Sequence, residues 1–168
     1  FCKGLNEREG EKYRVPTEAE WEYACRAAST MRWCFGENAS LLTSYAWNSF
    51  NSSDKMHPVG QKTANGFGLF DNYGNVWEWC SDWYGSDYYL SSPERDPTGP
   101  SAGDQCVLHG GAFINTGFSL RSASRFSRGP LHCSAYIGFR VARTMRAAPV
   151  SSRGKDGDPS PVSRIQSQ

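Results

Sequence analysis

Two carboxylates lie close together in residues 66–80 (GFGLFDNYGNVWEWC), a stretch rich in glycine and aromatic residues. Glu78 stands between Trp77 and Trp79, and Asp71 lies a short way before them. A carboxylate in apolar surroundings is costly unless it is paired or bound to a metal. Ca²⁺ binds carboxylate oxygens together with backbone carbonyls. The stretch is therefore compatible with a cation site and with a glutamate that forms an ion pair with a core arginine.

A strand over residues 76–80 must position this glutamate. Strand side chains alternate between two faces, so Glu78 would share a face with Val76 and Cys80, and both tryptophans would lie on the other face. Asp71 would then act as the second carboxylate, and carbonyl groups of the turn before the strand would complete the ligand shell.

Cysteines are the other residues with chemistry of their own. No two of them form a CxxC pair and no histidine stands at zinc-finger spacing, so a structural zinc site is not expected. The even count permits disulfides as well as free thiols. The six are Cys2, Cys25, Cys34, Cys80, Cys106 and Cys133.

The composition predicts one domain and a tail. Only 38% of the 168 residues are hydrophobic but 14% are aromatic, which favours a loop-rich fold held by aromatic packing. The net charge of +1 does not indicate a nucleic-acid partner, and no apolar run is long enough to span a membrane. The chain opens on Phe1 and not Met, so we expect a missing N-terminal part and cannot read targeting.

Two helices are expected near the start, over residues 1–10 and from Thr17 onward, with a short strand at 13–15 between them. Thr17 and Glu20 form a capping box, and Trp21, Ala24 and Cys25 supply the apolar face of the second helix. Residues 29–64 have no period and are predicted to be loops. Short core segments are expected at 106–108, 120–123 and 137–142. Residues 144–168 have few apolar residues and are expected to form a disordered tail.

Four stretches together resemble the formylglycine-generating enzyme family, also called the sulfatase-modifying-factor domain. They are YRVPTEAEWEYACR at 13–26, NGFGLFD at 65–71, GNVWEW at 74–79, and Gly110-Gly111 with Gly138-Phe139-Arg140. The resemblance covers residues 1–143, which would form one N-terminally truncated domain. It implies an α+β fold of the C-type-lectin type, with few helices, small antiparallel sheets and much irregular loop.

The resemblance also implies a structural Ca²⁺ site in the central stretch. Carried over residue by residue, its ligands are the side chains of Asp71 and Glu78 and the carbonyls of Gly74 and Val76. This agrees with the chemistry of the two carboxylates and favours the cation.

Catalysis does not carry over from the family. Its enzymes oxidise a substrate cysteine with a copper-binding pair of cysteines just after the Gly-Gly, and Asn115 and Leu120 stand at those positions here. Neither is a soft-metal ligand, and Cys106 and Cys133 are poor substitutes. The related iron-dependent sulfoxide synthases need a histidine cluster from a domain that is absent. We therefore expect no copper, no iron and no formylglycine generation.

Residues 107–136 use a restricted vocabulary that lacks Lys, Glu, Gln, Met and Trp. An AAC codon randomised at its two adenines never encodes those five residues. Small, polar and aromatic residues alternate without period between segments that we call the islands. The islands are Gly110-Gly111, Leu120–Ala123, Arg125, Pro130 and Ile137–Arg140.

On this fold, the pattern resembles the variable proteins of diversity-generating retroelements, of the Treponema variable-protein type. The resemblance implies a binding face displayed on a rigid scaffold, as in antibody paratopes, where aromatic residues give contact area and serines give adaptable hydrogen bonds. Ile114 and Leu131 are candidates for core positions instead. The predicted binding residues are Phe113, Asn115, Thr116, Phe118, Ser119, Ser124, Phe126, Ser127, Arg128, His132, Ser134, Ala135 and Tyr136.

The sequence thus predicts a non-catalytic, Ca²⁺-stabilised bacterial domain that binds a protein or another macromolecule through residues 113–136. The resemblance favours the cell surface or the extracellular space. One alternative is an oxidoreductase of the sulfatase-modifying type with a divergent active site. Another is a structural domain, or an ordinary family member whose last segment happens to lack five residue types.

Overall fold

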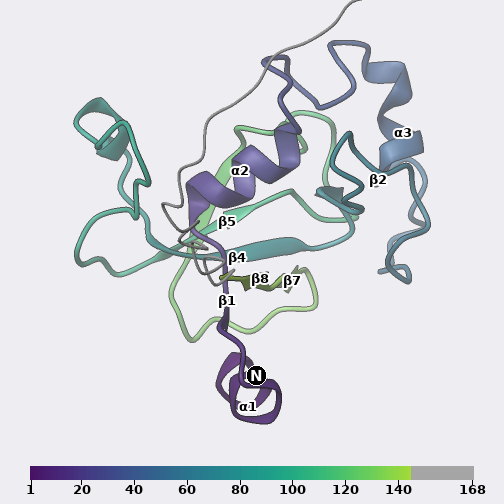
Figure 1. Ribbon diagram of the computed structural model, residues 1–168. Coiled ribbons are helices and arrows are strands. Elements are labelled where there is room, and N and C mark those ends of the chain that lie inside the picture. The colour runs from purple at the N-terminus through teal and green to yellow at the C-terminus, as the bar shows by residue number, and fades with distance from the viewer. Residues whose placement is uncertain (145–168) are drawn as a thin grey trace, which may run out of the picture.

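The computed structural model describes residues 1–144, so the predicted tail at 144–168 lies outside the described residues from 145 on. Figure 1 shows the arrangement of the elements. The helices are α1 (Cys2–Glu9), α2 (Glu18–Arg26) and α3 (Leu42–Tyr45), with 3₁₀ turns at Ala39–Leu41 and Tyr88–Leu90. The strands are β1 (Tyr13–Arg14), β2 (Ala46–Trp47), β3 (Tyr73–Gly74), β4 (Trp77–Trp83), β5 (Cys106–His109), β6 (Arg125–Arg128), β7 (Ile137–Gly138) and β8 (Ala142–Arg143).

The main sheet has four strands in the order β6-β5-β4-β7. Its longest strand, β4, confirms the strand expected at 76–80, and side chains alternate along it as predicted. Trp77 packs in one apolar cluster with Leu108, whereas Cys80 packs in another with Trp21. The sheet therefore separates two cores, and Glu78 faces the one beneath α2.

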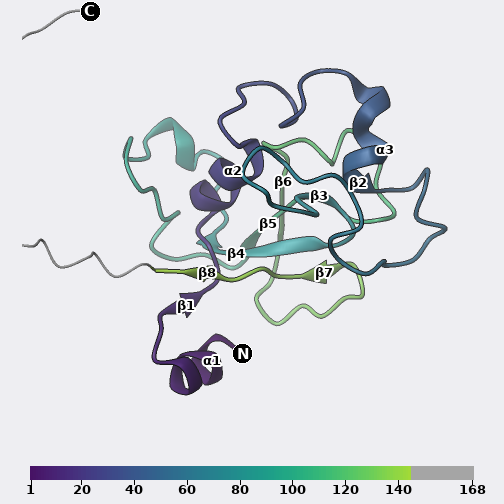
Figure 2. The ribbon, with the colours of Figure 1, turned by 45° about the vertical axis from the view of Figure 1, so that its right-hand side comes forward.

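Helix α2 lies across one face of this sheet, in contact with β4 and β5 (Figures 1 and 2). The predicted capping box is present: the Thr17 side chain accepts a hydrogen bond from the Glu20 amide, and the Glu20 carboxylate accepts one from the Thr17 amide. Trp21 and Cys25 are buried. The amide of Glu18 donates to the Asp82 carboxylate of β4, which ties the start of the helix to the sheet.

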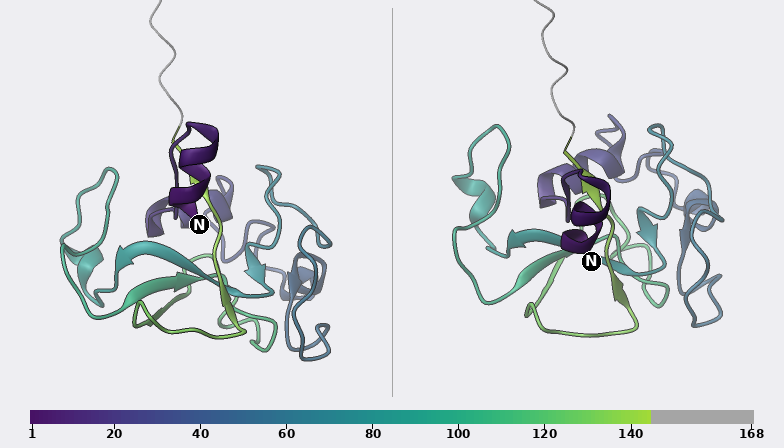
Figure 3. Two further views of the ribbon diagram at one scale, coloured as in Figure 1. Left: turned by 90° about the horizontal axis from the view of Figure 1, so that it is seen from below. Right: turned by 60° about the horizontal axis from the view of Figure 1, so that its bottom comes forward.

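Helix α1 projects from the bottom of the domain in Figure 1 and lies in front of it in the views from below (Figure 3). None of its residues is buried, and it ends as expected at Gly10, which adopts a left-handed conformation with φ 68°. The chain then enters β1, which pairs antiparallel with β8. In Figure 2, β8 and β7 follow one another beside β4.

The stretch predicted as loops, 29–64, contains short elements that the sequence did not reveal. Among these, α3 and β2 lead to the parallel pair β2–β3, in which Trp47 lies opposite Gly74. A side chain at Gly74 would be impossible, because a Cβ atom there would lie 2.0 Å from the carbonyl oxygen of Trp47. This close approach fixes the turn that precedes β4.

The predicted α+β architecture, with few helices, small sheets and much irregular chain, is confirmed. Two details differ: the β2–β3 and β4–β7 pairs are parallel, and β6 lies within the segment expected to be irregular. Two- to four-residue strands carry too little alternation to be recognised in sequence. In the described part of the chain, no helix combines the length and the apolar character that crossing a bilayer requires.

Candidate functional site

A groove of about 420 Å³ opens on the predicted binding segment. Five predicted binding residues line it: Asn115, Phe118, Ser119, Ser124 and Phe126. The other lining residues are Trp77, Arg121, Ala123 and Arg125. The structure thus gathers part of the predicted set around one concavity, which is the usual form of a ligand site.

The floor of the groove is aromatic. Trp77, on β4, is 9% exposed and stacks on Phe126 of β6, with 5.2 Å between the ring centroids. Between them in the sheet, Leu108 of β5 lies in register with Phe126. Three adjacent strands therefore hold the floor rigid, and the stacked rings leave a flat apolar surface for a ligand.

The wall is a chain of turns between residues 113 and 124. The amide of Ala112 donates to the Asn115 side chain, and the Ser124 hydroxyl donates to the Phe118 carbonyl. Phe118 itself is 75% exposed, and the Arg121 guanidinium lies over its ring at 4.3 Å from the centroid. The wall thus presents a ring and a cation on a backbone held by its own polar side chains.

Both ends of the segment are fastened to the central stretch. The amide of Phe113 donates to the Asn75 carbonyl at 2.9 Å, and the amide of Trp77 donates to the Tyr136 carbonyl at 2.8 Å. The stretch containing Asp71 and Glu78 therefore positions the start and the end of the predicted binding segment.

Several island residues are structural supports beneath the segment. Gly111 has φ +77°, and a Cβ atom there would lie 2.3 Å from Cδ2 of Leu120. Leu120 is fully buried and its carbonyl accepts a hydrogen bond from the Trp33 indole at 2.8 Å. Ser122 is also fully buried and bonds to the Tyr73 hydroxyl. Substitution at these positions would disturb the fold.

Arg125, the next island, joins the groove to a buried charge cluster under α2. Its guanidinium binds the Glu18 carboxylate through Nε and Nη2, the latter at 2.9 Å, and Nε2 of His109 lies 2.9 Å from the same carboxylate. Burial acts to raise the pKa of Glu18, but the hydrogen bonds of His109 and Arg125 outweigh it and hold that pKa below its ordinary value. Glu18 is therefore an anion that fixes Arg125.

The predicted binding residues fall into three groups by exposure. Thr116, Phe118, Arg128, His132, Ala135 and Tyr136 are exposed. Asn115, Ser119, Phe126, Ser127 and Ser134 are half-buried. Phe113 and Ser124 are buried, at 5% and 7% exposure, and so lie beneath the surface that a ligand would meet.

The two positions considered as core are not core. Ile114 is 42% exposed and Leu131 is 93% exposed. Both lie on turns, where an apolar side chain has no facing layer to pack against. They extend the exposed apolar area of the segment.

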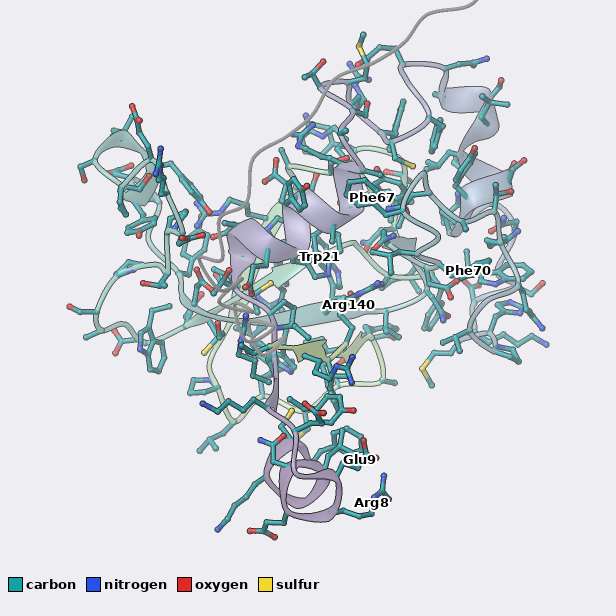
Figure 4. The ribbon with its side chains drawn as sticks, viewed as in Figure 1. Arg8, Glu9, Trp21, Phe67, Phe70 and Arg140 are labelled. Carbon is teal, nitrogen blue, oxygen red and sulfur yellow. The ribbon has the colours of Figure 1, made fainter. Side chains whose placement is uncertain are left out.

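The carboxylate of Glu78 forms the ion pair that the sequence left open as an alternative. Arg140 donates to it through Nε and Nη2, and the Trp21 indole donates to Oε2 at 2.6 Å. Figure 4 shows Trp21 reaching from α2 toward Arg140. A carboxylate has about four acceptor sites, so these three bonds leave one on Oε1.

Asp71 fits a cation more directly. Its Oδ2 accepts a hydrogen bond from the Gly60 amide at 2.7 Å, whereas its Oδ1 is buried without a hydrogen-bond partner. Within residues 1–144, no three side chains of His, Cys, Asp or Glu form a metal-binding group, so a cation here would also need backbone carbonyls. The predicted carbonyls are those of Gly74 and Val76. The unpaired Oδ1 of Asp71 is compatible with Ca²⁺, whereas the Arg140 guanidinium already binds Glu78 and the Asp71 carbonyl, and the four-ligand site stays a prediction.

All six cysteines lie within the described residues and are free. Burial raises the pKa of Cys25 to about 12 and also raises the pKa values of Cys34, Cys80 and Cys106. At the positions that match the copper ligands, Asn115 bonds to the Ala112 amide and Leu120 is packed in the core.

Four groove residues were absent from the predicted binding set: Trp77, Arg121, Ala123 and Arg125. The two arginines and Ala123 belong to islands, which the sequence marks as structural. Trp77 belongs to the central stretch and reaches the groove only through the pairing of β4 with β5 and β5 with β6. Only Trp77 had a usable signal, because the predicted alternation of β4 turns it away from Glu78.

Comparison with known proteins agrees with this geometry. Residues 1–145 match the family model described as the sulfatase-modifying factor enzyme 1-like domain. The formylglycine-generating enzyme of Streptomyces coelicolor is 38% identical over an alignment of 144 positions, which covers 77% of this chain and 46% of that protein. The serine/threonine-protein kinase pkn1 of Chlamydia caviae is 40% identical over 136 residues, 79% of this chain and 21% of that protein. The chain thus spans less than half the length of these relatives.

Solved structures show the same likeness. Treponema denticola variable protein 1 superposes with a TM-score of 0.74 at 35% identity, covering 78% of this chain and 47% of that one. PvdO from Pseudomonas aeruginosa superposes with a TM-score of 0.76 at 29% identity, covering 86% and 57%.

Proposed function

Since the chain belongs to the sulfatase-modifying factor enzyme 1-like domain family, we propose that it is a non-catalytic member that binds a protein ligand. The binding face is formed by residues 113–136 and is diversified between the islands. The observation that carries this proposal is the separation of the segment into buried supports and exposed positions.

The separation follows the sequence pattern in part. Gly111, Leu120 and Ser122 are buried island residues, while Thr116 and Phe118 between them face solvent. An exposed residue on a turn contributes little to stability, so its replacement is tolerated. A segment built this way can change its binding surface without losing its fold. Several residues depart from the pattern: Ala112, Phe113 and Ser124 lie between islands and are buried, whereas Ala123 and Pro130 belong to islands and are exposed. We assign the three buried residues a supporting role.

The likeness to Treponema denticola variable protein 1 supports the proposal. That chain shares the fold with this one, 35% of the aligned residues are identical, and it is a variable protein by name. The pattern of an adenine-randomised codon in residues 107–136 is independent of that likeness.

The chemistry of the segment supports the absence of catalysis. Asn115 and Leu120 offer an amide and a buried alkyl group where the enzymes of the family hold thiols. Burial favours the neutral thiol at Cys25 and Cys80, so these residues are poor nucleophiles and poor ligands. The proposed Ca²⁺ near Asp71 is structural, and we propose neither copper nor iron.

Sequencing tests the diversification. The 3′ part of the gene is read in many descendants of one cell, with residues 29–64 as the control because they are equally rich in loops. We expect substitutions concentrated at 113–136 and sparing the islands. A segment as uniform as the control would contradict the proposal.

The alternative function is formylglycine generation or a related oxidation, as the names of curated relatives indicate. It is tested by incubating the chain and copper with a peptide that carries a sulfatase-type cysteine. Mass spectrometry then measures the aldehyde product, with the Streptomyces coelicolor enzyme as the positive control. We expect no aldehyde from this chain, and its formation would favour the enzyme.

A further inference from the structure

A second groove adjoins the first. It has a volume of about 330 Å³ and meets the aromatic groove at Arg121 and Ala123, which line both. Its other lining residues are Arg26, Thr30, Met31, Arg32 and Glu37. The two grooves thus form one continuous surface on either side of a ridge made by Arg121 and Ala123.

Arginines dominate the second groove, and two of them are partly neutralised. Arg26 binds Glu22 through Nε at 2.6 Å and donates to the Met31 carbonyl. Arg32 lies 3.4 Å from a carboxylate oxygen of Glu37. Both carboxylates hold their arginines at the edge of the groove.

Arg121 has no such partner. Its Nε donates to the Phe118 carbonyl at 2.9 Å, and among the described residues no carboxylate lies within ion-pair distance of its guanidinium. Arg128, beside the first groove, likewise lies over the Phe126 ring at 4.1 Å and donates to the Ser127 carbonyl. Residues 105–144 contain no Asp or Glu. The exposed cations of this face are therefore left for a ligand to pair.

We infer that the two grooves together bind an acidic segment of a protein. An apolar side chain of that segment enters the groove floored by Trp77 and Phe126, and its carboxylates pair with Arg121, which has no carboxylate partner in the described part of the chain, where the two grooves meet. The inference rests on the proposed function and names the class of ligand that this face selects. It also gives a role to Arg121, an island residue that the proposed diversification leaves unchanged.

The chemistry favours carboxylates. A guanidinium that lies on an aromatic ring is shielded from water on that side and keeps its terminal NH₂ groups free for a bidentate carboxylate. An aromatic floor with a few convergent charged groups is the usual form of a specific pocket. Nucleic acid fits less well, because Glu22 and Glu37 lie at the second groove and the whole chain carries a net charge of only +1.

Random peptides displayed on phage provide the probe. The full chain is panned against the library, and enriched peptides are then synthesised and measured by fluorescence anisotropy at several salt concentrations. The test variant is Arg121→Gln, and its matched control is Arg8→Gln on α1, at the far end of the molecule (Figure 4). The variant Ala123→Trp places a bulky indole on the ridge and so obstructs both grooves. Ala102→Trp, on an exposed loop, controls for the added indole. Thermal melting checks that each variant is folded.

We expect acidic peptides with an aromatic or aliphatic side chain to be enriched and their binding to weaken with salt. Arg121→Gln should reduce their affinity about tenfold, while Arg8→Gln leaves it unchanged. If the enriched peptides are neutral or basic and Ala123→Trp abolishes their binding, the acidic ligand is wrong but the proposed binding function stands. If Ala123→Trp leaves the binding of the enriched peptides unchanged, both the acidic ligand and the proposed binding face are wrong. A single-stranded oligonucleotide is measured in the same assay. If it binds more tightly than the peptides and Arg121→Gln abolishes that binding, the ligand is nucleic acid and not protein.

Discussion

Single residues in this domain are constrained mainly by buried charge. Glu18 and Glu78 are 1% and 7% exposed, and each binds one arginine from the last part of the chain, Arg125 and Arg140 respectively. A buried carboxylate without its partner is strongly unfavourable, because its desolvation is no longer offset. Replacing Arg125 or Arg140 is therefore expected to destabilise the fold more than replacing the other half-buried residues of the C-terminal segment.

Replacing Arg125 tests this constraint. Arg125→Ala should lower the free energy of unfolding by about 3–5 kcal/mol, because it leaves Glu18 buried with only His109 beside it. Urea denaturation measures the change. The matched control is Arg128→Ala, at the other end of β6, whose side chain is exposed and should cost within about 0.5 kcal/mol. Equal effects of the two substitutions would show that the buried ion pair is not a determinant of stability.

The sequence indicates a buried charge at only one of the two glutamates. Two tryptophans flank Glu78, which predicts that its carboxylate is paired with an arginine or bound to a cation. Glu18 was not identified, since a glutamate in the first turn of a helix is ordinarily exposed and interacts with the helix dipole. Its burial depends on β5 and β6 packing under α2, and contacts between residues so distant in the chain leave no local pattern.

At the scale of elements, the elements predicted correctly are those with strong local signals. Helix α2 has its capping box, α1 has its terminal glycine, and β4 has its alternation. The missed elements, α3, β2 and β6, are only two to four residues long. Their existence depends on a neighbour: β2 pairs with β3. Such strands are consequences of the assembled fold and cannot be read from their own residues.

The β2–β3 pair offers a direct test of this dependence. Gly74→Ala should cost more than about 3 kcal/mol or prevent folding, because the new Cβ would overlap the Trp47 carbonyl at 2.0 Å. Gly60→Ala is the matched control, since its φ of +77° equals that of Gly74 within a degree but nothing lies within 4 Å of its Cβ. It should cost only the left-handed backbone, about 1 kcal/mol. A comparable loss in both variants would exclude the close approach as the cause.

At the scale of the whole molecule, the domain joins a fixed body to the segment 113–136, which we propose is variable. The body consists of α2, the central stretch and β4–β5, which the sequence motifs of the family identify. The segment between residues 113 and 136 has no helical or strand periodicity, so neither its local structure nor its ligand can be derived from the hydrophobic pattern. The restricted vocabulary of the sequence predicts a binding surface there, and the grooves became visible only in the folded chain.

Removal of calcium tests the fixed body. If Ca²⁺ binds at Asp71, chelation should lower the melting temperature by roughly 5–10 °C, since a ligand held by the folded state alone at a hundred times its Kd stabilises by about 2.7 kcal/mol. Differential scanning calorimetry with and without EDTA measures the shift, and added Mg²⁺ is the control. Asp71→Asn should melt alike in both conditions. An unchanged melting temperature of the parent chain would show that Glu78 and Asp71 need no cation.

The two buried ion pairs also set the order in which the chain becomes stable during synthesis. Glu18 and Arg125 are 107 residues apart, and Glu78 and Arg140 are 62 apart. A nascent chain therefore exposes both glutamates on the ribosome without their partners until almost all of residues 1–144 have been translated. Residues 113–136 are translated before Arg140, so on the proposed function any diversified version of the segment is complete before the second ion pair can form. On that proposal, correct folding is the first requirement that each version of the segment must meet.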